Sequence, residues 1–403
     1  MTVRIAPSRA AGTVQAPPSK SMAHRLLLAA GLANGTSTVK NLADSNDVCA
    51  TADCLAALGA AIRRQNGGAV VTGCNPALRA DAVTLPCRES GSTLRFLLPL
   101  CLLSTEPATL IGTEKLLSRP LSVYEALCRA RGLTYAIGRA SVTVAGPLTG
   151  GAFTVPGGIS SQFVTGLLYA LPLIGGGTVR LLPPVESRSY IDLTLDALQS
   201  FGVAARWMDE LILTVPNGPY RPADVTVEGD WSNAAFLEGL NLLGGDVTVT
   251  GLNEASRQGD RVYRAHFAAL AAGTPTIDLA DCPDLGPVLF ALAGALHGAT
   301  FTGVQRLRLK ESDRVAAMQT ELRKLGVETA ATETTLTVFP GLQAPTEPLD
   351  GHNDHRVVMA EALLLSAVGG VIEGAEAVAK SFPDFWEQYR ILGVDCDELD
   401  QQQ

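Results

Sequence analysis

Basic and hydroxyl-bearing residues stand just ahead of very apolar segments at several places in this chain. In the first such run, residues 17–25, Lys20 and Arg25 precede the apolar residues 26–30. Two prolines and the capping side chain of Ser19 predict that a buried helix begins here. A helix start offers free N–H groups and partial positive charge, so the added cations favour an anion site. A capped surface helix with solvated charges is the alternative for this run alone.

Similar helix starts recur along the chain. Gly91 lies between two serines and one turn ahead of Arg95, and Gly157-Gly158 leads into Ser160, which predicts loop-to-helix junctions suited to phosphate. Cations stand in other loops that begin helical segments, at Arg119, Lys310, Arg314, Arg356 and Lys380. With Lys20, such cations can neutralise two phosphates and a carboxylate. Each one alone is more often a solvated surface charge, and their shared placement is what favours a common anionic ligand.

Two kinds of helical segment alternate and must position these residues. The apolar kind is followed by a glycine turn and a β-branched strand, at residues 19–33, 91–103, 160–174, 231–243, 284–296 and 354–368. The amphipathic kind ends near a glycine, at residues 47–58, 121–131, 191–201, 261–272, 314–325 and 385–392. Two short strands follow most of the amphipathic segments. The pattern predicts six βαβαββ-like units in two similar α/β domains, divided near the Pro- and Gly-rich residues 216–222.

Length and composition agree with a globular protein that binds small molecules. The chain has 403 residues, a formal net charge of −9 and 47% hydrophobic residues, which favours two packed domains and argues against nucleic acid as a partner. The eight cysteines form no C-x-x-C pair and the five histidines are not spaced as ligands to one another, so we expect reduced cysteines and no metal cluster. No membrane-length apolar run or leader segment is recognised, so we expect a cytoplasmic protein without a membrane partner.

Several of these runs match one family closely. The chain contains P-S-K-S-M-A-H-R, S-G-S-T-L-R, S-R-P-L, S-S-Q-F, Y-I-D-L-T-L, E-G-D-W-S-N-A-A, K-E-S-D-R, N-D-H-R and K-S-F-P-D-F. With them it resembles the 5-enolpyruvylshikimate-3-phosphate synthase family from Pro17 to Pro383. The resemblance implies an inside-out α/β barrel in each of two domains, with three βαβαββ units around buried parallel helices. It implies domain limits of 19–225 for one, and 1–18 with 226–403 for the other, with the active site in the cleft between them.

The resemblance implies transfer of the enolpyruvyl group of phosphoenolpyruvate to the 5-hydroxyl of shikimate 3-phosphate. Inorganic phosphate leaves through a tetrahedral intermediate, in the pathway to chorismate and aromatic amino acids, with no metal or other cofactor. By resemblance, shikimate 3-phosphate is held by Lys20, Ser21, Arg25, Ser160, Ser161, Gln162, Ser187, Asp284 and Lys310. Phosphoenolpyruvate is held by Lys20, Gly91, Arg119, Gln162, Arg314, Arg356 and Lys380. We expect a monomer, and we expect ligand binding to bring the two domains together.

The reaction needs a base for the hydroxyl and an acid for the methylene carbon of phosphoenolpyruvate. Asp284, at a helix start among cations, stays ionised and fits the base. Glu311 and Lys20 remain alternatives for delivering the proton, and Lys380 completes the set of predicted catalytic residues. His355 is expected to orient its neighbours.

The chain departs from the family pattern at three positions. Glu89 stands where many members carry asparagine, Arg306 where asparagine is common near the shikimate ring, and Phe96 where proline or leucine is usual. We expect Glu89 and Arg306 to tune substrate affinity. Gly91 keeps the small residue that leaves room for the inhibitor glyphosate.

Two other functions compete with this interpretation. The UDP-N-acetylglucosamine enolpyruvyl transferases share the fold and the phosphoenolpyruvate chemistry. They carry a reactive cysteine in the loop before the arginine at the position of Arg119, whereas residues 112–118 here contain none. A non-catalytic binding protein on the same fold is the other alternative. The presence of Asp284 argues against it, because binding alone needs no base.

Overall fold

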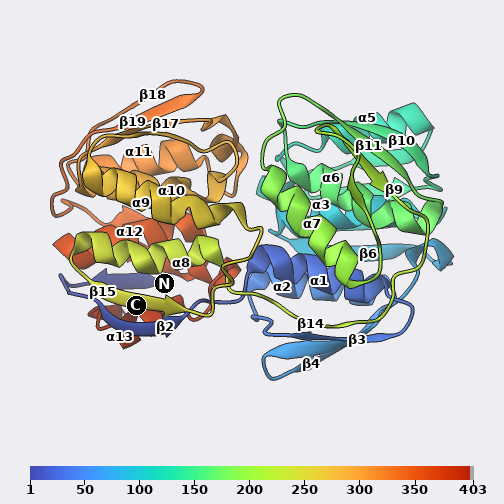
Figure 1. Cartoon of the computed structure of the whole chain (residues 1–403), viewed down its shortest axis with the longest axis horizontal. Coiled ribbons are helices and arrows are strands. Elements are labelled where there is room, and N and C mark those ends of the chain that lie inside the picture. Colours follow the sequence, from blue (N-terminus) through green and yellow to red (C-terminus); the bar gives the residue numbers. More distant parts are fainter. Residues whose placement is uncertain (400–403) are drawn as a thin grey trace. The chain divides into compact units, whose positions relative to one another are not determined.

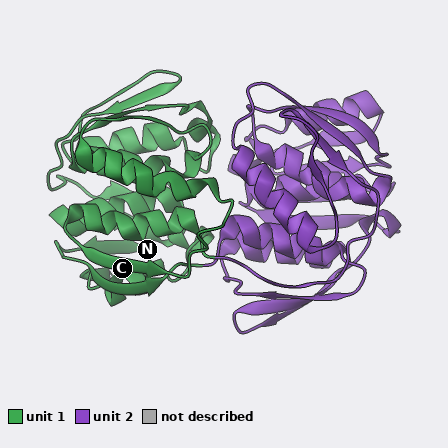
Figure 2. Ribbon diagram, in the orientation of Figure 1, with its two compact units in different colours: residues 1–17, 229–403 green, residues 18–228 purple. Residues whose placement is uncertain are grey.

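The computed structural model describes residues 1–399, which form two compact units. Unit 1 contains Met1–Pro17 and the described residues from Gly229 onward, and unit 2 contains Pro18–Glu228 (Figure 2). The chain therefore passes from one unit to the other at Pro17–Pro18 and again at Glu228–Gly229. The limits expected from the sequence are 19–225, and 1–18 with 226–403; whether each unit folds as an independent domain stays a prediction.

Unit 2 contains three four-stranded sheets with one common pairing pattern. In each sheet a parallel pair of strands is followed by two antiparallel strands. This is the pairing expected of a βαβαββ unit, so the predicted α/β class is confirmed. In order across each sheet the strands are β14 (Asp224–Thr226), β3 (Thr36–Lys40), β5 (Gly68–Thr72) and β4 (Ala61–Gln65); β6 (Val83–Arg88), β7 (Ala108–Gly112), β9 (Ser141–Ala145) and β8 (Thr134–Ile137); and β10 (Gly151–Pro156), β11 (Gly177–Leu182), β13 (Ile212–Val215) and β12 (Arg206–Trp207).

Unit 1 repeats this pattern in two sheets and reduces it in a third. The strands of the two complete sheets are β16 (Thr276–Asp278), β17 (Ala299–Thr302), β19 (Thr335–Val338) and β18 (Thr329–Ala331), then β20 (Leu349–Asp350), β21 (Gly370–Glu373), β1 (Thr2–Ile5) and β22 (Cys396–Leu399). The third sheet pairs only β15 (Asp246–Thr250) with β2 (Ala11–Gln15). Its antiparallel pair is absent from the described residues because just three residues, 273–275, separate the following helix from β16. Strand β1, near the N-terminus, pairs antiparallel with both β21 and β22 and so belongs to this unit.

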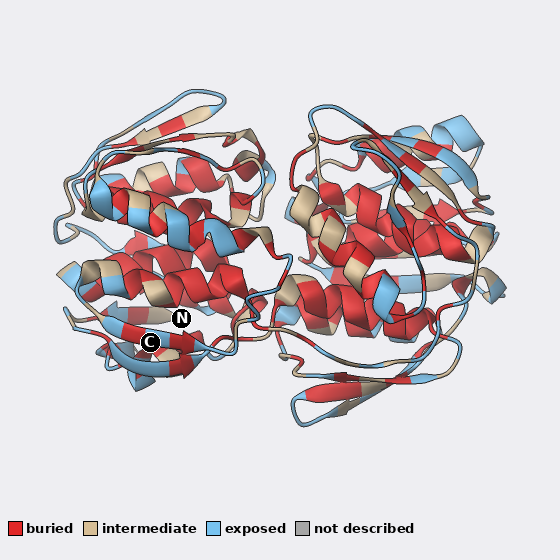
Figure 3. Cartoon of the chain, viewed as in Figure 1, coloured by how far each residue is buried: buried red, intermediate tan, exposed pale blue. Residues whose placement is uncertain are grey.

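The most buried helices lie inside each unit with sheets around them, whereas other helices keep exposed residues at the surface (Figures 1 and 3). In unit 2 they are α1 (Lys20–Leu32), α2 (Asn46–Ala57), α3 (Gly91–Cys101), α4 (Glu114–Leu117), α5 (Ser122–Arg131), α6 (Ser161–Ala170) and α7 (Arg188–Ser200). In unit 1 they are α8 (Trp231–Glu238), α9 (Tyr263–Ala272), α10 (Gly286–Ala295), α11 (Arg314–Lys324), α12 (His355–Val368) and α13 (Phe385–Ile391). Each unit has its own hydrophobic core. Every residue of α1 from Met22 to Leu32 is buried, which explains why this helix is apolar on all sides.

Several predicted segments end earlier than expected. The helices expected over 160–174 and 231–243 change to short 3-10 helices after Ala170 and Glu238. In the first case Pro172 lacks the N–H that an α-helix needs. The remaining 3-10 segments are Pro76–Leu78, Gly259–Val262, Pro283–Leu285, Gln305–Leu309 and Ala375–Lys380. Among the described residues, no helix combines the length and the apolar character that crossing a membrane requires.

Candidate active site

In unit 2, polar side chains cap the starts of the three most buried helices. Ser19 caps α1 by accepting from the Met22 N–H at 3.4 Å, and Ser90 caps α3 by accepting from the Thr93 N–H at 3.2 Å. Ser160 caps α6 through the Gln162 N–H at 3.3 Å. Each cap fixes the direction in which the chain enters the helix. The predicted substrate-binding residues Lys20, Gly91 and Ser161 thereby become the first residues of α1, α3 and α6.

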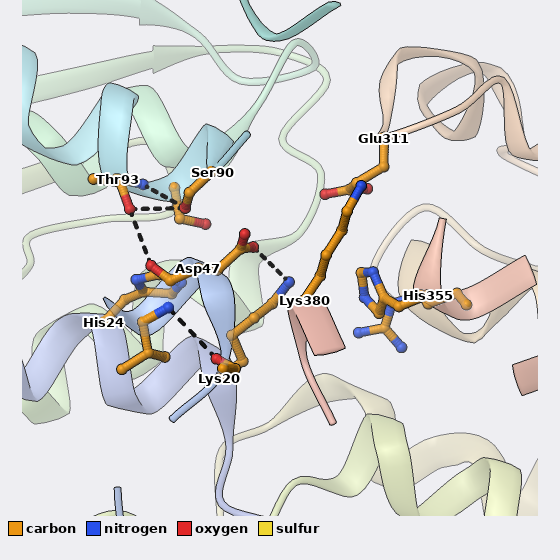
Figure 4. Close-up of polar contacts among 12 residues, drawn as sticks. Lys20, His24, Asp47, Ser90, Thr93, Glu311, His355 and Lys380 are labelled. Carbon is orange, nitrogen blue, oxygen red and sulfur yellow. Dashed lines mark hydrogen bonds and ion pairs between the residues drawn. The ribbon is translucent and has the colours of Figure 1, made fainter. Parts of the chain in front are cut away.

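The predicted binding residue Lys20 forms an ion pair with Asp47. Its Nζ lies 3.0 Å from Asp47 Oδ2, and both side chains are largely buried (Figure 4). Asp47 belongs to the first turn of α2, where the partial positive charge of a helix start favours a carboxylate. The carbonyl of Asp47 accepts from the Thr93 hydroxyl at 3.4 Å, which links α2 to α3. The sequence analysis did not identify Asp47; the capping run Ser45-Asn46-Asp47 was the signal for it.

Gly91 leaves the space in which the Arg119 guanidinium lies. A Cβ atom added at Gly91 would stand 2.7 Å from Arg119 Nη1 and 2.9 Å from Cζ. Arg119 is buried, in the loop between α4 and α5. The absence of a side chain at position 91 therefore decides where this cation lies. Both residues are predicted ligands of phosphoenolpyruvate, and the structure brings them together.

Gln162 is held from both ends of its amide group. Its Oε1 accepts from Arg95 Nη1 at 2.7 Å, and its Nε2 donates to Ser92 Oγ at 2.9 Å. Arg95 also donates to the carbonyl of Pro120 at 3.1 Å, next to Arg119. The contacts of one arginine thus connect the starts of α3 and α6 with the loop that carries Arg119.

Arg25 lies deeper than a surface anion site requires. Its guanidinium donates to Thr194 Oγ1 at 2.9 Å and to the carbonyls of Ser21 and Tyr190 at 2.7 and 2.9 Å. Burial lowers its pKa to about 10. The unusual Phe96 packs against it, with the Arg25 Cζ 5.2 Å from the ring centroid. In this structure the side chain of Arg25 joins α1 to α7, which begins directly after the buried Ser187.

In unit 1 the carboxylate of Asp284 meets three predicted cations. Its Oδ1 lies 3.1 Å from Lys310 Nζ and 2.9 Å from Arg314 Nη1, and its Oδ2 lies 3.1 Å from Arg356 Nη2. Asp284 lies in the 3-10 segment ahead of α10. Arg314 is the first residue of α11, and Arg356 lies in the first turn of α12. Three loops separated in the sequence are therefore joined through one carboxylate.

Arg314 also contacts two further carboxylates. It donates to Asp354 through Nε at 2.9 Å and Nη2 at 3.2 Å, and to Glu311 Oε2 through Nη2 at 2.9 Å. Asp354 is fully buried, caps α12 and accepts from the Ser312 hydroxyl at 3.0 Å. Burial opposes charge on Arg314, but these carboxylates raise its pKa above the ordinary value. Although burial also opposes ionisation of Asp354, the Arg314 guanidinium holds the pKa of that carboxyl below its usual range.

The other predicted cations of unit 1 are held in different ways. Burial lowers the pKa of Lys310, while the charge of Asp284 opposes that shift. Arg356 donates to Ser232 Oγ at 2.5 Å and to the carbonyl of Asp284 at 3.2 Å. Lys380 Nζ donates to the carbonyl of Asn353 at 2.6 Å. Ser232 and Asn353 were not identified as site residues, although both lie in runs, D-W-S-N and N-D-H-R, that carry the family resemblance.

The predicted site residues therefore form one set in each unit. Unit 2 holds Lys20, Ser21, Arg25, Gly91, Arg119, Ser160, Ser161, Gln162 and Ser187, and unit 1 holds Asp284, Lys310, Glu311, Arg314, Arg356 and Lys380. His355 is buried beside Asp354, with Nδ1 and Oδ1 3.8 Å apart. Glu89 is half-buried directly before the cap of α3, and Arg306 is buried. Among residues 1–399, no three His, Cys, Asp or Glu side chains are grouped to hold a metal ion.

Comparison with known proteins places this geometry in context. A sequence model of one family, described as EPSP synthase (3-phosphoshikimate 1-carboxyvinyltransferase), matches residues 5–389. A 3-phosphoshikimate 1-carboxyvinyltransferase from Clostridium kluyveri is 39% identical over 98% of both chains. One from Methanoculleus marisnigri is 38% identical over 92% of this chain and 94% of its own. Among solved structures, an EPSP synthase from Acinetobacter baumannii superimposes with a TM-score of 0.77 at 21% identity, covering 98% of this chain and all of that chain, which supports the fold.

Proposed function

The chain belongs to the EPSP synthase family, and we propose that it transfers the enolpyruvyl group of phosphoenolpyruvate to the 5-hydroxyl of shikimate 3-phosphate, releasing inorganic phosphate. The observation that carries this proposal is the Asp284 carboxylate, held by Lys310, Arg314 and Arg356. A carboxylate among these cations can orient them for anion binding, and it can also act as the base for a reaction that removes a proton from a hydroxyl group. The family match supports the second role for Asp284.

The proposed reaction has two halves. In the first half, Asp284 takes the proton of the 5-hydroxyl of shikimate 3-phosphate, and the hydroxyl oxygen attacks C2 of phosphoenolpyruvate. A proton is added to C3 in the same half. This gives the tetrahedral intermediate, in which C3 is a methyl group. In the second half that methyl group loses a proton and the C2–phosphate bond breaks. Glu311, 2.9 Å from Arg314, and Lys20, 3.0 Å from Asp47, remain the two candidates for moving the C3 proton.

The cations of the site bind the anionic substrates and stabilise charge in both halves of the reaction. We assign phosphoenolpyruvate to Lys20, Arg119, Arg314, Arg356 and Lys380, with Gly91 and Gln162. We assign shikimate 3-phosphate to Lys20, Ser21, Arg25, Ser160, Ser161, Gln162, Ser187, Asp284 and Lys310. Positive groups that bind the phosphate and carboxylate stabilise the charge that develops as phosphate leaves. The contacts of Arg314 and Arg356 with Asp284 support this assignment, because they hold the guanidinium groups in place before the ligands arrive.

The acceptor substrate distinguishes the proposed function from its rivals. The family match favours shikimate 3-phosphate over UDP-N-acetylglucosamine. Mass spectrometry after incubation with phosphoenolpyruvate and shikimate 3-phosphate tests the proposal. We expect a product heavier than shikimate 3-phosphate by one enolpyruvyl group. Ligand binding without product would support the binding-only alternative instead.

We further propose that the protein works in the cytoplasm as a monomer, on small-molecule substrates and without nucleic-acid or membrane partners. The net charge of −9 supports the exclusion of nucleic acid. The sheets and helices of each unit cover one another, which supports a monomer. Sedimentation analysis with and without both substrates tests the oligomeric state.

A further inference from the structure

The turn that precedes α12 has an unusual backbone. His352 and Asn353 both adopt left-handed conformations, with φ values of 49° and 51°. Residues other than glycine adopt such conformations uncommonly, Asn and His more often than most, and a run of them needs support from the surroundings. Two in succession therefore call for a specific restraint on residues 350–354.

The restraint comes from Glu321 on α11. His352 Nε2 lies 2.8 Å from Glu321 Oε1, while Oε2 of the same carboxylate accepts from the Asp350 N–H at 3.0 Å. Asp350 Oδ1 in turn accepts from the His352 N–H at 2.8 Å. The side chain of Glu321 is 1% exposed and that of His352 is 28% exposed. Glu321 is therefore fixed in the core, and His352 contacts it from the surface.

The charges around this contact favour an ion pair between His352 and Glu321, which we call the tether. Lys324 Nζ lies 2.9 Å from Glu321 Oε2. Burial opposes ionisation of Glu321, but the hydrogen bonds from His352, Lys324 and the Asp350 N–H hold the pKa of that carboxyl below its usual range. Burial raises the pKa of the fully buried Glu361 carboxyl on α12 well above the ordinary value, and the charge of Glu321 adds to that shift. The hydrogen bond to Glu321 raises the pKa of His352, and the charge of Asp350 raises it further. Burial and the charge of Lys324 act in the opposite direction.

The turn contacts two cations of the proposed active site, Lys380 and Arg314. The carbonyl of Asn353 accepts from Lys380 Nζ at 2.6 Å, and the next residue, Asp354, receives both Nε and Nη2 of Arg314. Arg314 begins the same helix that carries Glu321 seven residues later, on the same face. Helix α11 therefore holds the turn at two points.

We propose that His352 is a positioning residue for the enolpyruvyl transfer: its contact with Glu321 holds the left-handed turn that aims Lys380 and Asp354. This inference rests on the proposed function, since it assigns Lys380 and Arg314 to phosphoenolpyruvate. It reaches beyond it by naming a residue that touches neither substrate. The consequence is selective: loss of the tether impairs the use of phosphoenolpyruvate and leaves the affinity for shikimate 3-phosphate nearly unchanged.

Two substitutions separate the tether from the backbone conformation. In His352→Asn the new asparagine readily adopts the left-handed conformation, but its side-chain amide is too short to reach Glu321. His352→Gln places an N–H group near the position of Nε2 and restores a neutral donor. His297→Gln, at an exposed histidine in the turn between α10 and β17, is the matched control. All variants are assayed below their measured unfolding temperatures.

Steady-state phosphate release with both substrates varied is the first readout. We expect H352N to lower kcat/KM for phosphoenolpyruvate about tenfold, the equivalent of one hydrogen bond to a charged group. H352Q should recover part of that loss below the pKa of His352 and nearly all of it above, and the KM for shikimate 3-phosphate should change less than about twofold. Wild-type activity in H352N, equal losses in both variants, or equal changes in both KM values would overturn the inference.

The pH dependence adds a readout that a purely structural role would not move. Below the pKa of His352 the wild type has a charged donor and H352Q a neutral one, so their kcat/KM ratio should be about threefold to fivefold. Above that pKa both donors are neutral and the ratio should approach one. Other titrating groups are shared and cancel in the ratio, and H297Q should give a flat ratio. A flat ratio for H352Q would also contradict the inference.

Hydrogen exchange keeps this test distinct from the proposed function. We expect faster amide exchange over residues 350–356 in H352N than in H352Q or H297Q, whatever the protein catalyses. A wild type that releases no phosphate with shikimate 3-phosphate would refute the proposed function, and with it the kinetic role of His352. Unchanged exchange in H352N would refute the tether itself, even in an active enzyme.

Discussion

Arg314 donates to Asp354 through two nitrogens, Nε at 2.9 Å and Nη2 at 3.2 Å, in a position where the arginine is 1% exposed. The guanidinium also reaches the proposed base Asp284 and the candidate acid Glu311. Arg314 is therefore the charge that holds three carboxylates of unit 1 together. A phosphoenolpyruvate anion that uses this arginine has to compete with carboxylates that already occupy it.

Removing Asp354 should destabilise the protein strongly. Asp354→Ala leaves the buried Arg314 with less compensation and removes the cap of α12, so we expect a loss of about 3–5 kcal/mol. Urea denaturation followed by tryptophan fluorescence measures it, because Trp231 and Trp386 both lie in unit 1. Glu125→Ala, which breaks an exposed i,i+4 pair with Arg129, is the control and should cost less than about 1 kcal/mol. Similar losses in the two variants would contradict the buried-network interpretation.

Asp284→Asn should separate catalysis from binding. The amide keeps the shape of the side chain but cannot act as a base, so we expect kcat to fall by about 10²–10⁴-fold. Binding of phosphoenolpyruvate should persist or tighten, because the cations at Lys310, Arg314 and Arg356 lose their shared negative partner. Isothermal titration measures the binding and phosphate release the turnover. A variant with near-normal kcat would exclude Asp284 as the base.

Gly91→Ala should weaken phosphoenolpyruvate binding without unfolding the protein. The added methyl group would lie 2.7 Å from Arg119 Nη1, the end of a flexible side chain that can move away. We expect the KM for phosphoenolpyruvate to rise about tenfold, as for the loss of a charge-assisted hydrogen bond. Gly273→Ala, where no atom lies within 4 Å of the added methyl, is the control. If both variants keep the wild-type KM, the close approach of Gly91 and Arg119 has no role in binding.

His24 should make the protein less stable in mild acid. Burial, with Lys20 and Arg25, holds its pKa well below the ordinary value, and its Nδ1 lies 2.7 Å from Thr51 Oγ1. Its neutral form is therefore present in both states above pH ~6.5, and below that pH only the unfolded state gains the proton. Stability should then fall by up to about 1.4 kcal/mol per pH unit. His24→Asn should remove this part of the acid dependence between pH 6.5 and 5, whereas parallel stability curves for wild type and variant would show that His24 does not titrate as expected.

Local sequence signals predicted where helices and strands lie in the chain better than they predicted which strands pair with one another. Ser19 and Ser90 cap helices where the sequence placed helix starts, because capping depends only on neighbours in the chain. Strand β14 pairs with β3 across 186 positions, as Asp224 with Thr38, and no local signal indicates that pairing. The βαβαββ repeat was recognisable, but the short link after Gly273 removed the antiparallel pair from one unit.

The same division applies to the candidate site. Cations at helix starts, and the carboxylates Asp284 and Glu311, could be found from the sequence, whereas the other carboxylates that pair with these cations could not. Asp47 and Lys20 meet across 27 positions, and Asp354 and Arg314 across 40, so both pairs depend on how the helices pack. The role of His352 was also hidden, because only the folded backbone reveals its left-handed conformation.

Phosphate release from phosphoenolpyruvate tests the central claim most directly. Purified protein is mixed with phosphoenolpyruvate and either shikimate 3-phosphate or UDP-N-acetylglucosamine, with Asp284→Asn as the matched inactive variant. We predict release with shikimate 3-phosphate alone, and little release from the variant. Release only with the sugar nucleotide would contradict the proposed acceptor. No release with either, from folded protein that still binds phosphoenolpyruvate, would contradict the assignment of catalysis itself.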